Sequence, residues 1–332
     1  MKLLVVILNY RVTDLTIDCL RSLAARIDRV PGARVALCEN GTGGDAPERL
    51  GNVIDENEWR RWVDLTVIPT NLGFTGGNNL VIRPALASSD PPEYVLLLNA
   101  DTLVQDGSLE RLVEFMDRHP KVGIAGSKLV WPDGETQASP FRFTGIRSAF
   151  DTGLRLKLVT RILGQSVSLS PKPDSDCRVD WVSGASMILR RSMLDEIGLL
   201  DEGLYTYFDD IDICLRARRA GWESWYVPES VVVHLEGRST GIAGGAVKRR
   251  PAYWFQARHR FLLKSYGRLR TTLIDAAFIV GHAIWRLRRF FSRGPDPDPE
   301  QYFADFVLNS VFRAGFEVRE VENPALRKTM TP

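Results

Sequence analysis

A carboxylate stands directly after a short apolar run in the first third of the chain. Residues 94–98 read YVLLL, which is typical of a strand buried on both faces of a parallel sheet. The run ends at Asn99 and Asp101, just beyond the carboxyl end of a central strand, where open α/β sheets bind ligands. We interpret Asp101 as a ligand for a divalent metal, Mg²⁺ or Mn²⁺. The alternative is that Asp101 only caps a helix beginning at Thr102.

Two further stretches carry side chains suited to chemistry. A second apolar run ends in His234, whose neutral imidazole is either a metal ligand or an ordinary structural histidine. Asp209, Asp210 and Asp212 gather at the start of a predicted helix over residues 207–220. Adjacent carboxylates in a cleft raise one another's pKa, which suits a general base, but acidic residues also favour helix N-termini. These residues alone leave both interpretations open.

A glycine-rich stretch, residues 73–78 with the sequence GFTGGN, follows the third predicted strand. Its glycines allow close approach to the backbone, as in loops that hold phosphate. The stretch matches neither GxGxxG nor GxxxxGK[ST], so it does not identify a dinucleotide or a nucleoside triphosphate as the ligand.

The order of the predicted elements brings several of these side chains to one edge. Four apolar runs alternate with helical patterns, which predicts an α/β fold with a mostly parallel sheet and right-handed crossovers. The runs are residues 3–8, 34–38, 64–68 and 94–98. A polar residue follows each run, namely Asn9, Glu39, Asn71 and Asp101. In a parallel sheet all four lie along the same edge, which favours a ligand groove over four unrelated turns.

The remainder of the chain continues this pattern less regularly. We predict helices at residues 109–116 and 191–197, and strands at residues 122–130, 179–189 and 230–234. Residues 144–175 resist assignment, apart from a short basic helix within residues 154–163. Gly244 and Gly245 suggest a boundary, which divides the chain into residues 1–243 and a helical, basic extension over residues 244–332.

The composition is that of a globular protein, with 332 residues, 44% of them apolar and 25% charged, and a net charge of +2. The four cysteines form no CxxC pair, so neither a disulfide framework nor a zinc site is indicated and a reduced, cytoplasmic setting is expected. Residues 3–8 are too short for a signal peptide, and no apolar stretch is long enough to span a bilayer.

Basic residues are concentrated near the C-terminus. Residues 238–293 contain 13 Lys or Arg and one acidic residue, Asp275. Residues 249–264 alternate basic and aromatic side chains, a pattern found in nucleic-acid binding and in membrane-surface helices. Residues 273–285 are mostly apolar and precede more arginines. We expect peripheral attachment to the inner face of the plasma membrane and no nucleic-acid partner; the alternative is a packed helix with a solvated basic end.

Seven motifs together resemble a known family. In chain order they are VVILNYR, ENGTGG, NLGFTGGNN, LLLNADTLV, VSGASMILRR, YFDDIDICLRARRAGW and VVVHLEGRS. They resemble the inverting glycosyltransferases of family 2, in the rhamnosyltransferase-like branch, over roughly residues 1–267. The resemblance implies a GT-A fold, in which a Rossmann-like sheet with flanking helices binds a nucleotide-sugar.

The resemblance also implies roles in binding that donor. Asn9 and Tyr10 would lie near the nucleobase, and Glu39 would hydrogen-bond the pyrimidine, although the family usually has Asp there. The NLGFTGGNN motif would add its polar and glycine positions to the same site. Those positions are Asn71, Gly73 and Asn78.

A third set of roles concerns the metal and the chemistry. Asn99 and Asp101 match the family's metal motif, with Asn in place of its first acid, and His234 matches a second metal ligand. Asp210 matches the catalytic base, and Asp209 stands where the family usually has Glu. In the implied reaction Asp210 takes the proton of an acceptor hydroxyl, whose oxygen displaces the nucleoside diphosphate with inversion while the metal stabilises the leaving group.

The resemblance favours L-rhamnose from dTDP-rhamnose as the donor, and a saccharide or a lipid-diphosphate-linked saccharide as the acceptor. Two other classes of protein are weighed against this. A nucleotidyltransferase that makes nucleotide-sugars would need a basic, glycine-rich loop after the first strand, and residues 10–18 lack one. A non-catalytic scaffold that binds nucleotide-sugars would not need Asp101, Asp210 and His234 together.

Overall fold

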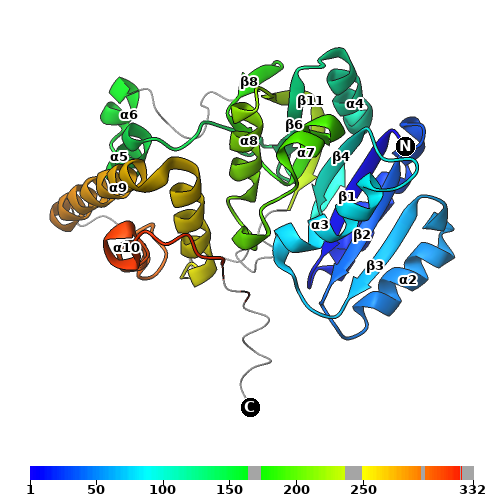
Figure 1. Cartoon of the computed structure of the whole chain (residues 1–332), viewed down its shortest axis with the longest axis horizontal. Coiled ribbons are helices and arrows are strands. Elements are labelled where there is room, and N and C mark those ends of the chain that lie inside the picture. The colour runs from blue at the N-terminus through cyan, green and yellow to red at the C-terminus, as the bar shows by residue number, and fades with distance from the viewer. Residues whose placement is uncertain (164–172, 236–248, 293–295, 322, 324–332) are drawn as a thin grey trace.

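The computed structural model of the chain describes residues 1–163, 173–235, 249–292, 296–321 and 323 (Figure 1). Its centre is a nine-stranded sheet in the order β3-β2-β1-β4-β10-β6-β11-β5, with β8 paired to β11. The boundary predicted at Gly244 and Gly245 lies outside the described residues, so the division there stays a prediction.

The N-terminal half is the predicted succession of parallel strands and helices. β2 pairs in parallel with β1 and β3, and β1 pairs in parallel with β4. The elements are β1 (Leu3–Asn9), α1 (Thr13–Ala24), β2 (Arg34–Asn40), α2 (Ala46–Glu56), β3 (Val63–Ile68), α3 (Gly73–Leu86) and β4 (Tyr94–Asn99), with short 3₁₀ turns η1 (Ile27–Arg29) and η2 (Trp59–Arg61).

Alternate residues of each strand enter two separate cores, because successive side chains point to opposite faces of a sheet. Leu3, Val5 and Ile7 of β1 pack with α1, α2 and α4 (Ser108–Arg118), whereas Leu4 and Val6 pack with α3 and with α7 (Arg191–Ile197). Helices on both faces account for the unbroken apolar runs in the sequence.

The second half of the sheet is mixed. β10 (Ser186–Arg190) is antiparallel to both β4 and β6 (Val122–Val130), and β11 (Glu223–His234) is parallel to β6. The short β5 (Thr102–Val104) pairs with the end of β11, although only two residues separate it from β4. The pairing of β5 with β11 therefore brings the end of β11 close to the end of β4, and β11 has a register shift between Val227 and Val231 where it pairs with β6.

The structure corrects one prediction for the middle of the chain and confirms another. The predicted strand at residues 179–189 is three strands, β8 (Cys177–Val179), β9 (Trp181–Val182) and β10, because the chain leaves the main sheet to pair β9 with β7 (Pro140–Phe141). The short helix expected within residues 154–163 is confirmed as α6 (Lys157–Leu163), and a further helix that was not predicted, α5 (Ile146–Leu154), precedes it. Arg155, with φ of 51°, separates them.

The C-terminal helices form a third packing unit beside the sheet (Figure 1). α9 (Ala252–Ser292) is two helices joined at Gly267, whose φ of 73° is outside the helical range. Phe255, Phe261 and Phe278 of α9 share a core with α8 (Asp209–Arg219), the 3₁₀ turn η3 (Glu202–Leu204) and α10 (Tyr302–Leu308). The short α11 (Val311–Ala314) completes the described helices.

Candidate active site

Asp101 and His234 are brought together by the pairing of β5 with β11. His234 stands opposite Thr102, and the backbone N–H of Leu235 donates to the carbonyl oxygen of Asp101 (2.9 Å). The Nε2 atom of His234 lies 3.5 Å from Oδ1 of Asp101, and both side chains are buried. Since Thr102 begins a strand, the alternative that Asp101 caps a helix is wrong.

The Asp101 carboxylate is only partly satisfied. Its Oδ1 atom is buried and accepts no hydrogen bond from any residue that the structure describes. A buried carboxylate oxygen without a partner is unfavourable by itself, so it marks a position where a cation or donor is expected. Asn99 flanks the pair, with its Nδ2 atom 3.4 Å from Nε2 of His234.

Gln137, which the sequence analysis missed, fixes the orientation of His234. Its Nε2 atom donates to the carbonyl oxygens of His234 (2.6 Å) and Val130 (3.5 Å), so its Oε1 atom accepts from Nδ1 of His234 at 3.1 Å. A hydrogen on Nδ1 leaves the lone pair on Nε2, the atom that faces Asp101. This is the arrangement in which outer residues orient a metal-binding histidine.

The acidic pair lies at the start of α8. Asp209 is buried and Asp210 half-buried. Asp210 accepts hydrogen bonds from the backbone N–H of Ile211 (2.8 Å) and of Gly184 (3.4 Å). Phe208, not an aspartate, is the N-cap, and no side chain caps the helix. Side-chain capping therefore does not explain the pair, while the position of both aspartates in the first turn also agrees with the preference of acidic residues for helix N-termini.

Burial shifts the titration of both carboxyls. Burial raises the pKa of Asp210 to about 6, although the N–H groups of Ile211 and Gly184 favour the ionised form. Burial raises the pKa of Asp209 well above its ordinary value, and the neighbouring charge of Asp210 raises it further. A carboxyl with a pKa near 6 is ionised at neutral pH and basic enough to accept a proton.

A short backbone segment, residues 184–185, lies between the Asp101–His234 pair and the acidic pair of α8. The N–H of Asn99 donates to the carbonyl oxygen of Ala185 (3.0 Å), and the adjacent Gly184 N–H faces Asp210. The metal-ligand candidates and the base candidate thus flank residues 184–185 at one edge of the sheet. Sequence reasoning quoted the VSGAS motif without assigning its glycine this position.

The loop that presents the acidic pair is strained and braced. Tyr205, Tyr207 and Phe208 have φ values of 60°, 68° and 62°, a region that non-glycine residues rarely adopt. Tyr253 of α9 packs against Tyr205 and Tyr207, with ring centroids 5.9 and 6.0 Å away. Packing against α9 therefore holds the loop in this conformation.

The glycine-rich stretch supports the same loop. It is the first part of α3, and the Thr75 N–H donates to the carbonyl oxygen of Tyr205 (3.2 Å). A Cβ atom on Gly73 would lie 2.4 Å from that oxygen, so this glycine is required by the close approach of Tyr205. The role of Gly73 in donor binding stays a prediction.

The predicted nucleobase residues form one buried hydrogen-bonded group. Asn9 is the last residue of β1, and its Nδ2 atom donates to Glu39, the sixth residue of β2. Glu39 also accepts from the backbone N–H (2.5 Å) and the hydroxyl (2.9 Å) of Thr42. Tyr10 follows Asn9 and is half-buried, with the Arg11 guanidinium 5.0 Å from its ring. The structure thus brings Asn9 and Glu39 together, while their contact with a base stays a prediction.

Three asparagines serve the scaffold around this group. Asn40 donates to Oδ1 of Asn71 (2.9 Å) and accepts from the Leu72 N–H (3.0 Å), so it shapes the turn before α3. Asn78 donates to the carbonyl oxygen of Phe74 (2.7 Å) within α3. Sequence reasoning missed Asn40, although it precedes the glycine of ENGTGG.

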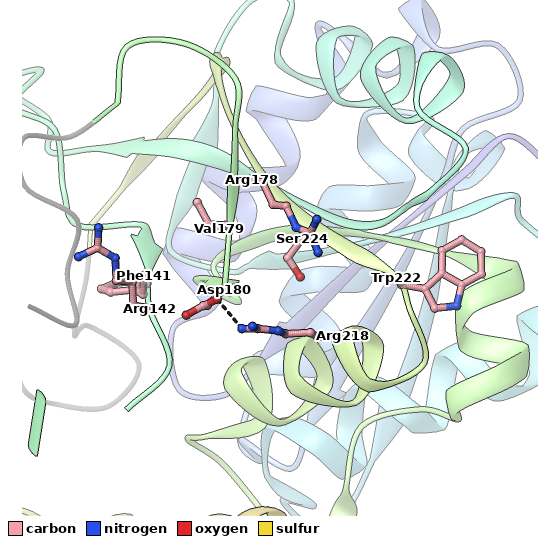
Figure 2. A pocket seen from close by; sticks show the side chains of 8 residues that line it. All are labelled: Phe141, Arg142, Arg178, Val179, Asp180, Arg218, Trp222 and Ser224. Atoms are coloured by element: carbon pink, nitrogen blue, oxygen red, sulfur yellow. Dashed lines mark hydrogen bonds and ion pairs between the residues drawn. The ribbon is translucent and has the colours of Figure 1, made fainter. Parts of the chain in front are cut away.

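A separate basic pocket of about 350 Å³ lies at the other end of α8 and β11 (Figure 2). Arg218, near the end of α8, points to Asp180 (2.7 Å), and Arg178 pairs with Glu223 at the start of β11 (3.0 Å). The acidic pair and His234 stand at the opposite ends of these elements. This pocket is therefore not the candidate active site.

Comparisons with known proteins show the family of this chain. The sequence model described as "Glycosyltransferase like family 2" matches residues 2–254. A Mycobacterium tuberculosis protein named N-acetylglucosaminyl-diphospho-decaprenol L-rhamnosyltransferase is 28% identical over 240 residues, covering 68% of this chain and 72% of its own length. The Escherichia coli rhamnosyltransferase WbbL is 26% identical over 166 residues, 49% of this chain and 60% of its own.

Solved structures share the fold. GalNAc-T7 with UDP, GalNAc and Mn²⁺ aligns with a TM-score of 0.59 and 15% identity over 95% of this chain and 59% of its own. The Pyrobaculum calidifontis mannosyltransferase PcManGT, with GDP-Man and Mn²⁺, aligns with a TM-score of 0.56 and 14% identity over 94% of this chain and 87% of its own. The chain has the GT-A fold and is a glycosyltransferase that belongs to the glycosyltransferase-like family 2.

Proposed function

We propose that this enzyme transfers L-rhamnose from dTDP-rhamnose, with inversion, to a lipid-diphosphate-linked saccharide in the synthesis of a cell-surface polysaccharide. The observation that carries the catalytic part is the placement of Asp210 and the Asp101–His234 pair on either side of residues 184–185. The sugar and the acceptor are proposed from the name of the mycobacterial relative.

The residues present suit a divalent metal. Among the described residues, no group of three or more His, Cys, Asp or Glu could hold a metal, so the protein supplies few ligands. Asp101 offers the free Oδ1 atom, His234 offers Nε2, and Asn99 lies beside them. Mg²⁺ or Mn²⁺ held there would take phosphate oxygens as further ligands and neutralise charge on the departing diphosphate.

Asp210 is the base in this proposal. Its carboxylate is aligned by the N–H groups of Ile211 and Gly184, and it would receive the proton of the acceptor hydroxyl. Asp209, whose pKa is raised by burial and by the neighbouring charge of Asp210, would have a supporting role beside the base. No covalent intermediate with the protein is required for inversion.

The pH dependence of the reaction follows from Asp210. Because burial raises the pKa of Asp210 to about 6, the base is protonated and inactive below that value. We expect kcat/KM to rise roughly tenfold per pH unit on the acid side and to level off above about pH 6. The measurement is kcat/KM from about pH 4 to 8 at saturating metal. A plateau that extends below pH 5 would contradict the assignment.

Gln137 should control binding of metal and nucleotide without touching either. Gln137→Met removes the acceptor that keeps hydrogen on Nδ1 of His234. We expect the Mn²⁺-dependent part of the affinity for dTDP to fall by roughly 10–100-fold, the usual effect of losing an outer partner. Calorimetric titration of dTDP with and without Mn²⁺ measures this. An equal loss without the metal would show a purely structural effect.

The function itself is tested with purified enzyme, dTDP-rhamnose, Mn²⁺ and a short-chain lipid diphosphate carrying N-acetylglucosamine. Mass spectrometry should detect a rhamnosylated product, and NMR should show inverted anomeric configuration. Parallel reactions with UDP- and GDP-sugars test the donor. Pyrophosphate release from dTTP and a sugar 1-phosphate would favour the nucleotidyltransferase alternative, and nucleotide binding without any transfer would favour the scaffold.

A further inference from the structure

The second half of α9 carries large apolar side chains that face solvent. Leu269 and Phe290 expose 76% and 78% of their surface, and Leu287 exposes 60%. The full set, which we name the α9 stripe, is Leu269, Leu273, Val280, Ile284, Leu287, Phe290 and Phe291. Isolated exposed apolar residues are ordinary, but a contiguous set of this size marks an interaction surface.

The spacing places the α9 stripe on one face of the helix. Its members follow one another at intervals of three, four and seven residues, apart from the adjacent Phe290 and Phe291, and such intervals return to the same side of an α-helix. The opposite face is already used, since Ile274, Phe278 and His282 are buried. Gly153 of α5 and Gly281 of α9 let the two backbones touch on that side. The α9 stripe is therefore a separate, exposed face of the helix, distinct from the face that packs in the core.

Arginines border the α9 stripe on both sides. At about 100° per residue, Arg268 and Arg286 lie about 100° to one side of Leu269, and Arg270 and Arg288 about 100° to the other. The only acidic residue of α9, Asp275, is buried and ion-paired with Arg258 at 2.7 Å. No described residue of α9 therefore places negative charge beside the stripe.

We propose that the α9 stripe lies in the surface of an anionic lipid bilayer, with α9 parallel to the membrane plane. An apolar face bordered by arginines suits this position, because the apolar side chains enter the acyl boundary while the guanidinium groups meet anionic headgroups. None of the described helices has a stretch long and apolar enough to cross a membrane, so the contact is peripheral.

A second copy of the chain fits this surface less well. A two-fold contact through the α9 stripe would bring the arginine borders of two identical helices together, with no carboxylate on α9 to separate them. Anionic lipid supplies the missing charge. The bilayer is therefore the occupant that the charge pattern favours.

The position of α9 connects this surface to the candidate active site. Its first half packs Tyr253 against the loop that presents Asp209 and Asp210. Docking of the second half would hold that loop near the membrane, where a lipid-linked acceptor resides. This connection, unlike the docking itself, rests on the proposed function.

Vesicle flotation with the full chain tests the docking. The parent protein should float with vesicles of phosphatidylcholine containing about a quarter phosphatidylglycerol, and less so as salt is raised. Leu269→Glu combined with Leu287→Glu should lower the partition coefficient by roughly 100-fold, since each inserted leucine contributes roughly tenfold. Both leucines are mostly exposed, so the variant should keep the parent's melting temperature.

Matched variants separate the contributions of the apolar side chains and of the arginines to vesicle binding. Val67→Glu changes an exposed apolar residue of the edge strand β3 in the same way as Leu287→Glu, and it should float like the parent. Arg268→Gln combined with Arg286→Gln should weaken binding by roughly tenfold and reduce its salt dependence. A parent that does not float at low salt, or a stripe variant that floats as the parent does, would overturn the proposal. A parent dimer that Leu287→Glu dissociates would show that a second copy covers the stripe.

The outcome is independent of the sugar chemistry, because flotation needs neither donor nor acceptor. A protein that floats but transfers no rhamnose would leave the docking surface intact and refute the proposed donor. With a water-soluble acceptor, the stripe variant and the parent should have equal kcat/KM, whereas only the parent should act efficiently on vesicle-embedded acceptor.

Discussion

Asp210→Asn is expected to lower turnover by roughly 10²–10⁴-fold, the usual contribution of a general base, and to leave the dissociation constant of the donor nearly unchanged. Asparagine keeps the size of the side chain, and its single amide oxygen can accept from the N–H of Ile211 or from that of Gly184, which bond to different oxygens of the Asp210 carboxylate. It cannot accept the proton of the acceptor hydroxyl. The measurements are kcat with saturating substrates and the dissociation constant of dTDP-rhamnose.

Stability provides the control for this variant. The folded-state pKa of Asp210 is about 6, above its ordinary value, so the folded protein holds this proton more tightly and loses stability as pH rises toward 6. Asp210→Asn should therefore raise the melting temperature at about pH 8 and have little effect below about pH 4. Asp209→Asn should reduce turnover less. A larger loss at Asp209 would exchange the roles of the two residues, and losses that follow melting temperature would argue against catalysis.

Asp101→Ala should remove the metal dependence of nucleotide binding. We expect the affinity for dTDP in the presence of Mn²⁺ to fall at least about 100-fold, because Asp101 is the only carboxylate in the proposed metal site. This loss exceeds the one expected for a residue such as Gln137, which only orients a metal ligand. The protein should stay folded, and without metal it should melt no lower than the parent, since the variant removes a buried oxygen that has no partner among the described residues.

The exposed Asp28 offers a matched control, because its only described contact is a surface ion pair with Arg61 at 3.5 Å. Asp28→Ala should bind dTDP and Mn²⁺ as the parent does. If Asp101→Ala binds dTDP equally well with and without Mn²⁺, and as tightly as the parent with Mn²⁺, the metal assignment is wrong.

The parallel half of the sheet could be predicted from the sequence because its strands and helices are specified by residues that are close together in the chain. Strands buried on both faces read as unbroken apolar runs, and the helices between them dictate parallel pairing. The placement of Asn9 and Asp101 at one edge follows from that pattern. Glu39 was expected after its strand and lies within β2, because strand ends are set by pairing that the pattern does not reveal.

The support of the site could not be predicted, because it depends on contacts between distant segments. Gln137 stands in an ordinary turn-like sequence, and nothing near it indicates a bond to His234 almost a hundred residues later. The close approach of Gly73 to Tyr205 likewise joins different parts of the fold. Single-residue chemistry proposed the acids as candidates, whereas the groups that contact and orient them are found only in the three-dimensional structure.

The position of β5 has a consequence for how the enzyme is made. β5 is synthesised immediately after β4, yet its pairing partner β11 emerges from the ribosome about 130 residues later. A nascent chain can close β1 to β4 through their short crossovers, but Asp101 meets His234 only after β11 has entered the sheet. Incomplete chains therefore lack the proposed metal site, and an unfinished enzyme cannot consume the activated sugar.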